Sequence, residues 1–456
     1  MPILPIVSGR PVPVVVVASV CLLLLATASI MALNSLSLAG DGSFYLLRVL
    51  GTEHVFGPDA RVLGNAVRQA PVLLAVRLGL TDTHLLAVLL GVGQLVVPAA
   101  VWSVALALSR AQSLAFSAVA ITAGICAGTT WFFSVSENVL SIPLTVLVAV
   151  LLWQPQRWRW GHVALASAVS TVLVASYETA ALTGSVLAVW ATWRAASSRS
   201  RLERFGGAIV ALLSSVSAIH GAAWMVAARG EANAQSLLLD MLTVNPWGLY
   251  VALASGFVLI YALTRRADGR LRWISYAAGA LGAAVTTVRL VMTSHNVFEA
   301  SFDAYAARGG AVLAAFVLEL FLFVLWSRSR SPASVPVSSE APVGHGDRRW
   351  PLLVPVLFVA AMVFADVQAL GRWSTSLDDF RAEVDTAVGV VSIDDALPPD
   401  RQQAVWGWTG SSLSLIVRGN ASAGVLVNTR PTYVPFPPSS AREQLADKYT
   451  WRRSLR

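Results

Sequence analysis

The chain has 456 residues, of which 56% are hydrophobic and 13% are charged, and its formal net charge is +8. A water-soluble domain carries about twice that charged fraction, so the composition excludes a soluble globular protein. The basic excess does not indicate a nucleic-acid partner, because the arginines fall between apolar segments and report orientation in a membrane. Both cysteines lie inside apolar segments, so we expect neither a disulfide nor a metal site from them.

Apolar segments follow one another along most of the chain, and a transmembrane helix needs about 20 such residues. By this criterion the sequence predicts about eleven spans, at 12–33, 84–108, 112–133, 139–153, 162–176, 180–195, 206–227, 247–264, 273–293, 310–326 and 350–368. We interpret the first as a retained helix, because its apolar run is longer than that of a signal peptide. The predicted fold is therefore an all-α polytopic membrane protein.

The arginines predict the orientation of these helices. With a cytoplasmic N-terminus, the inner loops hold 16 arginines and the outer loops hold six, leaving out the C-terminal tail. An excess on the inner side is typical of cytoplasmic loops, so this count favours an extracytoplasmic C-terminus. Lys448 is the only lysine beside 32 arginines, which is typical of a GC-rich bacterial genome. Together with the spans, this leads us to expect a protein of a bacterial inner membrane.

These features divide the chain into a transmembrane domain, 1–368, and a C-terminal extracytoplasmic domain, 369–456. The inner loop 327–349 is rich in Ser and Pro and predicts a flexible cytoplasmic linker. In the C-terminal part, Leu413–Val417 and Gly424–Asn428 predict short strands between turn signals. We expect a small α/β domain that depends on the helices for stability, because it is short for an independent domain.

Ionisable residues gather on the outer face in this orientation. The long first outer loop, 34–83, begins with Asp41 between two glycines, and Tyr45 and Arg48 follow in a stretch that predicts a helix at the membrane interface. Other outer loops contribute polar and aromatic residues, and one arginine lies about one turn inside the ninth span. These residues are Glu137, Asn138, Tyr177, Glu178, His295, Arg308 and, in the span, Arg289.

Each of these residues also has a simpler interpretation as a helix cap or a solvated loop residue. For Asp41 that interpretation is an N-cap of the following helix. For Glu137 and Glu178 it is weaker, because their loops are only a few residues long and the acids lie at helix ends. Ionisable groups next to apolar helices are costly unless they are hydrated or paired.

The arrangement resembles the membrane glycosyltransferases of the C superfamily (GT-C), which use polyprenyl-phosphate sugars. The resemblance is carried by the many spans, by the acid in LAGDGSFYLL near the start of a long outer loop, and by the outer tail. Many members have two adjacent acids at that point, whereas here Gly42 follows Asp41. The resemblance implies transfer of a sugar, with inversion, from a polyprenyl-phosphate donor to a glycan, glycolipid or protein acceptor.

The resemblance also implies roles for the outer residues. Asp41 would be the general base that takes the proton of the attacking sugar hydroxyl. Arg289 and Arg308, with His295 as a lesser candidate, would stabilise the charge on the leaving lipid phosphate. Glu137 and Glu178 would bind sugar hydroxyls or orient these cations, while the neighbouring Arg48, Asn138, Tyr45 and Tyr177 would complete the substrate site. We predict no metal site formed by protein side chains. Whether a divalent cation acts as a cofactor stays open.

Two alternatives stay open beside the glycosyltransferase. A multi-span transporter or flippase of a lipid-linked or polar solute would need charged residues near the middle of the membrane, where the sequence offers Arg289, Glu319 and Asp366. A non-catalytic membrane anchor would not need eleven spans. The motifs of a phosphate-binding loop, a nucleophile elbow and a zinc helix do not occur.

Overall fold

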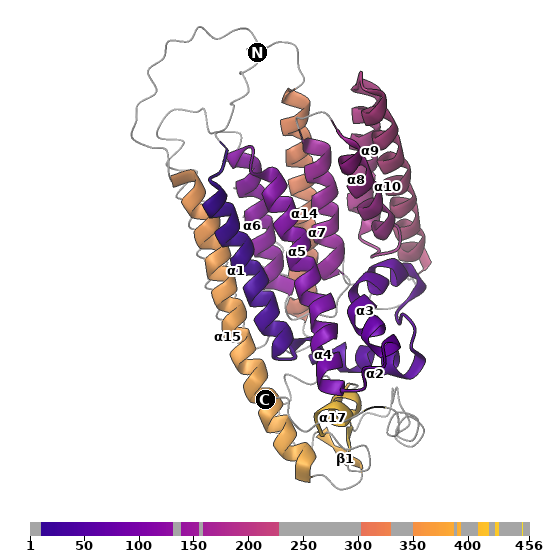
Figure 1. The fold of residues 1–456 in the computed structure, drawn as a ribbon, viewed down its shortest axis with the longest axis vertical. Helices are drawn as coiled ribbons and strands as arrows, with labels where there is room; N and C mark the ends of the chain where they lie inside the picture. The colour runs from indigo at the N-terminus through magenta and orange to yellow at the C-terminus, as the bar shows by residue number, and fades with distance from the viewer. Residues whose placement is uncertain are drawn as a thin grey trace.

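The computed structural model describes residues 11–130, 138–154, 158–227, 302–329, 350–386, 390–393, 409–418, 425–427 and 449. Within these ranges the chain is mostly helical, and the helices run side by side along the long axis (Figure 1). Four helical segments are long and apolar enough to cross a membrane, at Val14–Leu33, Thr83–Ser109, Arg201–Ala227 and Pro355–Thr386. The described part is therefore consistent with a membrane protein.

The bundle is formed by a series of helices that follow the predicted spans. They are α1 (Val14–Leu33), α4 (Thr83–Gly91), α5 (Val97–Ser109), α6 (Ser113–Thr130), α7 (Asn138–Trp153), α8 (Trp160–Leu173), α9 (Ala180–Ser197), α10 (Arg201–Ala227), α14 (Phe302–Ser329) and α15 (Trp350–Thr386). The predicted spans 247–264 and 273–293 lie outside the described residues, as does most of the predicted linker 327–349. The count of eleven spans therefore stays a prediction.

Helix α7 lies at the centre of the bundle. Nearly all of its side chains are buried, and it packs against α5, α8, α9 and α14. Its sequence, NVLSIPLTVLVAVLLW, is apolar on every side, as expected of a helix that is enclosed by other helices. Figure 1 shows α15 beside α1 on one side of the bundle and α9 with α10 on the other.

The predicted span 84–108 is not a single regular helix. Between α4 and α5 the chain forms one π-helical turn, η3 (Val92–Val96). A Cβ on Gly93 would lie 1.7 Å from the backbone oxygen of Arg68, and one on Gly91 would lie 2.9 Å from Cα of Ala32. The two glycines therefore allow α1 and α3 (Val62–Arg77) to approach the irregular turn closely.

A buried ion pair fixes the turn between α9 and α10. Arg194 Nη2 lies 3.5 Å from Glu203 Oε1, and the two side chains are 0% and 5% exposed. Arg194 also donates to the backbone oxygens of Leu152 and Gln154 at the end of α7. Glu203 accepts from the backbone N–H of Trp158 at 3.0 Å and from the Ser198 hydroxyl. Each of the two buried charges thus has hydrogen-bond partners as well as its counter-charge, as burial requires.

The C-terminal residues differ in part from the prediction. Leu413–Val417, predicted as a strand, belongs to helix α17 (Gly410–Arg418), so this prediction is wrong. The second prediction is confirmed, because β2 (Val425–Val427) pairs in parallel with β1 (Val390–Ser392). Helix α15 continues without a break through residue 369, where the outer domain was predicted to begin. An independent α/β domain at 369–456 stays a prediction.

The buried pair leads to a prediction about stability. We expect Arg194→Met to lower the free energy of unfolding by about 3–5 kcal/mol, because it leaves the Glu203 carboxylate buried without a cation. Arg381→Met is the matched control, since Arg381 pairs with Asp378 at 2.9 Å and Asp378 is 72% exposed. There we expect a loss below about 1 kcal/mol. Denaturation of the purified variants in detergent measures both, and equal losses would contradict the role given to the buried pair.

The irregular turn leads to a second prediction. We expect Gly93→Ala to destabilise the protein by about 1–3 kcal/mol, because the added methyl group forces α3 away from η3. Gly51→Ala is the control, since a Cβ on Gly51 has no atom within 4 Å. It should leave the unfolding midpoint unchanged or raise it slightly. A Gly93→Ala protein as stable as the parent would show that α3 does not pack here as described.

Candidate functional site

Asp41 occupies the residue before helix α2 (Gly42–Thr52), at the end of the bundle where α17 lies (Figure 1). It stands at the N-cap position, but its side chain makes no capping hydrogen bond. Its backbone is in the α region rather than the extended region that is usual for an N-cap. The simpler interpretation of Asp41 as a helix cap is therefore not supported by the geometry. One carboxylate oxygen, Oδ1, is buried.

Helix α2 confirms the predicted helix after Asp41, but its surroundings differ from the prediction. We expected an interfacial helix with one apolar face, whereas Leu46, Leu47, Val49 and Leu50 are all buried inside the protein. The helix packs against α3, α4, α17 and the short 3₁₀ turn η1 (Leu36–Leu38). Protein therefore covers most of α2, and this cover holds the start of the helix in a fixed place.

Residues from the C-terminal part attach to both ends of α2. The Ser43 hydroxyl donates to the backbone oxygen of Thr409 at 3.5 Å, next to the start of α17. The Tyr449 hydroxyl donates to the backbone oxygen of Leu50 at 3.1 Å. This oxygen is one of the last carbonyls of α2, which lack partners within the helix. Burial raises the pKa of the Tyr449 phenol, which keeps the proton that this hydrogen bond needs.

Tyr45 and Arg48 belong to an aromatic cluster on α2. The ring of Phe56 packs edge-on against those of Phe44 and Tyr45, with centroids 5.4 and 5.3 Å apart. The Arg48 guanidinium lies over the rings of Phe44 and Phe56, at 5.2 and 5.6 Å from their centroids. Gln69 holds Phe56 through two backbone hydrogen bonds of 2.8 and 2.6 Å. The cluster thus fixes a cation two helical turns from Asp41.

Glu178 and Tyr177 both contact Arg61, which was not among the predicted site residues. Nε and Nη2 of Arg61 both lie 2.9 Å from Oε1 of Glu178. The same guanidinium lies over the Tyr177 ring, 4.6 Å from its centroid. Both side chains of the ion pair are partly exposed, at 24% and 22%. The pair joins the first outer loop to the turn between α8 and α9.

Asn138, the first residue of α7, contacts the turn between α8 and α9. Its Oδ1 accepts from the hydroxyl of Thr179 at 3.4 Å and from that of Ser141 at 3.4 Å. The residue is 1% exposed, so Asn138 fixes the start of α7 against the turn. The structure therefore brings Asn138, Tyr177 and Glu178 together at this turn. Arg61, at the end of the loop 53–61, joins this group to the segment that follows α2.

The remaining predicted site residues cannot be placed by the structure. Glu137, Arg289 and His295 lie outside the described residues. Arg308 falls on α14, where only the backbone is described. Their roles stay predictions. Arg61 was not predicted as a site residue. The sequence does hold a hint of its ion pair, because Arg61 lies in an outer loop and Glu178 lies in a short outer loop.

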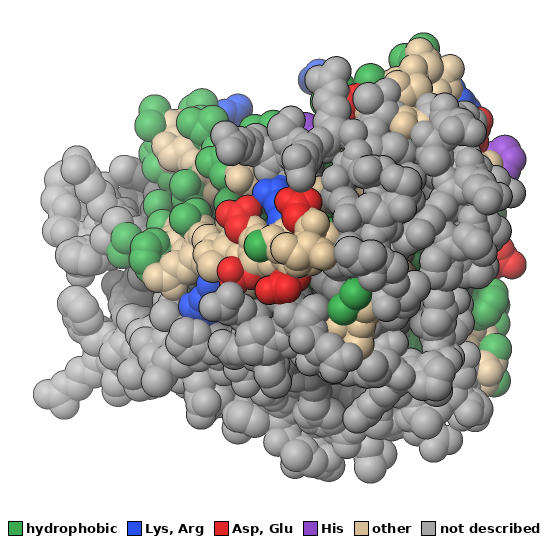
Figure 2. All heavy atoms as spheres, turned by 90° about the horizontal axis from the view of Figure 1, so that it is seen from below, with side chains coloured by type: hydrophobic (Ala, Val, Ile, Leu, Met, Phe, Trp, Pro, Cys, Tyr) green, Lys and Arg blue, Asp and Glu red, His purple; other side chains and the backbone are tan. Residues whose placement is uncertain are grey.

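The face at this end of the molecule carries both kinds of charge. Figure 2, viewed from below, shows red and blue side chains gathered among the described residues. On α15 the exposed Asp378 pairs with Arg381. Among the residues that the structure describes, no group of three or more His, Cys, Asp or Glu side chains is placed to hold a metal ion.

Comparisons of the chain with protein-family models, with curated proteins and with solved structures find no match. The function is therefore inferred from the residues and their arrangement. The arrangement is a carboxylate at the start of α2, an arginine of that helix held by aromatic rings, and an Arg–Glu pair that joins the following loop to the turn between α8 and α9.

The Arg61–Glu178 pair leads to a prediction about local opening. The backbone N–H groups of Leu63 and Gly64 donate to the oxygen of Ala175, at 3.0 and 3.2 Å, beside the pair. We expect Arg61→Met to speed hydrogen exchange at these two amides by about two- to fivefold, since a partly exposed pair contributes below 1 kcal/mol. Arg77→Met, at an exposed position on α3, should leave these rates unchanged. Unchanged exchange in Arg61→Met would contradict a role for the pair in fixing the loop.

Proposed function

We propose that the chain is a membrane glycosyltransferase that transfers a sugar from a polyprenyl-phosphate donor to a cell-envelope acceptor on the outer face. The observation that carries this proposal is the state of Asp41. Its carboxylate stands at the start of a buried helix without capping that helix. A carboxylate that begins a buried helix and does not cap it is suited to take a proton.

The reaction would need one base and one stabilised leaving group. The acceptor hydroxyl attacks the anomeric carbon of the donor sugar, and its proton passes to Asp41 as the new C–O bond forms. The bond from the sugar to the lipid phosphate breaks, and the phosphate leaves with the electron pair. Cationic donors stabilise the charge on this phosphate. In the proposal, Arg289 and Arg308 stabilise the charge on the leaving phosphate.

Other described residues support the proposal through rigidity and charge. Arg48 is held over the rings of Phe44 and Phe56, so its cation has a fixed place two helical turns from Asp41. Glu178 and Tyr177 are partly exposed and offer an acceptor and a ring to a sugar. Glu178 is already paired with Arg61, so a sugar hydroxyl would have to share the carboxylate with that guanidinium.

A transporter of a lipid-linked or polar solute is the second candidate, and one observation favours it. Glu319 and Asp366 lie within apolar helices and are 0% and 3% exposed. Among the described residues, both oxygens of Glu319 and Oδ1 of Asp366 are buried without a hydrogen-bond partner. Buried acids within apolar helices are typical of transport pathways. They do not explain the placement of Asp41.

The proposal is tested by following a radiolabelled sugar from polyprenyl-phosphate donors into product with purified, reconstituted protein. We expect Asp41→Asn to reduce transfer by about 10²-fold or more, since the amide cannot accept the proton. Asp59→Asn is the matched control, because Asp59 is an exposed acid of the same loop. It should transfer at the parental rate.

Two results would contradict the proposal. Equal transfer by the parent and Asp41→Asn would remove Asp41 as the base. If no donor in a broad panel were consumed but labelled lipid crossed the bilayer, the transporter would be the better account. The Asp41→Asn protein must elute like the parent in size-exclusion chromatography, so that loss of folding is distinguished from loss of the base.

A further inference from the structure

A cavity lies between α1, α5, α6, α7 and α15, away from the candidate site on α2. Its volume is about 80 Å³. Most of its lining is apolar, including Leu24, Trp102 and Ile142. The oxygen-bearing side chains in the lining are Thr27, Asn138 and Asp366. The cavity therefore has room for a few heavy atoms and combines an apolar wall with a small polar region.

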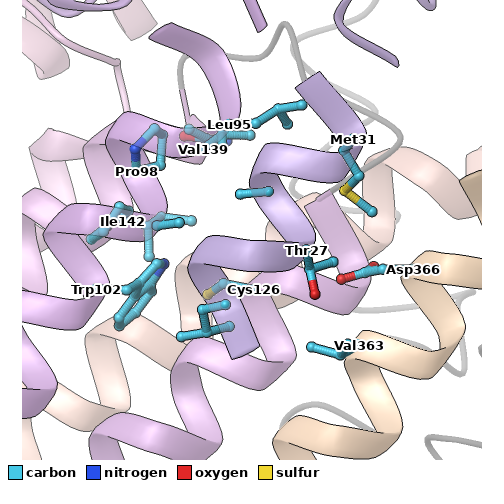
Figure 3. Close-up of a pocket in the computed structure, with 15 residues that line it drawn as sticks. Thr27, Met31, Leu95, Pro98, Trp102, Cys126, Val139, Ile142, Val363 and Asp366 are labelled. Atoms are coloured by element: carbon cyan, nitrogen blue, oxygen red, sulfur yellow. The ribbon is translucent and has the colours of Figure 1, made fainter. Parts of the chain in front are cut away.

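Asp366 is the acidic group that lines this cavity. It is 3% exposed, and among the described residues its Oδ1 is buried without a hydrogen bond. Figure 3 shows the oxygens of Asp366, from α15, and Thr27, from α1, pointing toward one another. An ionised carboxyl group inside an apolar helix bundle costs several kcal/mol, and a cation bound beside it in the cavity would offset that cost.

The hydrogen bonds of the neighbours define what that partner must supply. The Thr27 hydroxyl donates its hydrogen to the backbone oxygen of Leu23 at 2.8 Å, so it presents lone pairs to the cavity. Asp366 as a carboxylate is also an acceptor only. When Asp366 is ionised, two acceptors therefore face one another, and a donor bound between them would satisfy both. A metal cation fits poorly, because Na⁺, Mg²⁺ or Ca²⁺ would need more oxygen ligands than this apolar lining offers.

We infer that this cavity binds a small primary amine, with the ammonium group between Asp366 and Thr27 and the apolar body against Leu24, Trp102 and Ile142. An ammonium group carries three donors and a positive charge, so it satisfies both acceptors and forms a net-neutral pair with the carboxylate. An alcohol of the same shape has one donor and no charge, and it binds more weakly. This inference is independent of the proposed sugar transfer.

Fluorine NMR of trifluoropropylamine tests the inference on the full chain in phosphatidylcholine nanodiscs, with empty nanodiscs as the reference for partitioning. We expect saturable binding to the protein and at least about tenfold weaker binding to Asp366→Asn, which removes the charge. Thr27→Val should weaken binding by a smaller factor. Trifluoropropanol should bind the parent more weakly than the amine does.

Glu319→Gln is the matched control. Glu319 is equally buried and also without a hydrogen-bond partner among the described residues, but it does not line this cavity. Its variant should bind the amine like the parent. Equal binding to Asp366→Asn and the parent, an equal loss in Glu319→Gln, or no saturable binding above empty nanodiscs would each overturn the inference. Thermal unfolding of each variant confirms that it is folded before binding is compared.

Discussion

A polar group that this bundle buries needs a partner, because the helices around it are almost wholly apolar. This constraint explains the cluster at the turn between α9 and α10, where Arg194 donates to backbone oxygens at the end of α7 and Glu203 accepts from the Ser198 hydroxyl in the turn itself. It also explains Asn138, which joins α7 to the turn after α8. The helices gain their packing from apolar surface, but these few polar contacts determine which ends of the helices meet.

Much of the fold follows from simple features of the sequence, because long apolar runs leave a helix as the structure that satisfies its own backbone hydrogen bonds. The described helices follow the predicted spans for this reason. The π-helical turn at Val92–Val96 was not predicted, since it depends on the close approach of Arg68 to Gly93 from another helix. Leu413–Val417 was predicted as a strand because short apolar runs fit either structure, and packing against α2 and α15 selects the helix.

The candidate site could be predicted in part. The position of Asp41 at the end of an apolar run and the helix behind it are visible in the sequence. The partner of Glu178 is not, because Arg61 lies 117 residues away and is brought near by the hydrogen bonds from Leu63 and Gly64 to Ala175. The cover over α2 also depends on distant segments, whose contacts leave no periodic signal. The local sequence pattern therefore predicts the position of Asp41, whereas long-range packing determines its surroundings.

The two hydrogen bonds that tie α2 to the C-terminal part have a consequence for biosynthesis. Ser43 donates to Thr409, which lies 366 positions later in the chain. Leu50 accepts from Tyr449, which lies 399 positions later. A ribosome makes the N-terminal helices first, so α2 waits for its final neighbours until Thr409 and Tyr449 have been translated. The surroundings of α2 are completed only after that point. A nascent or truncated product therefore holds the carboxylate without the environment that positions it.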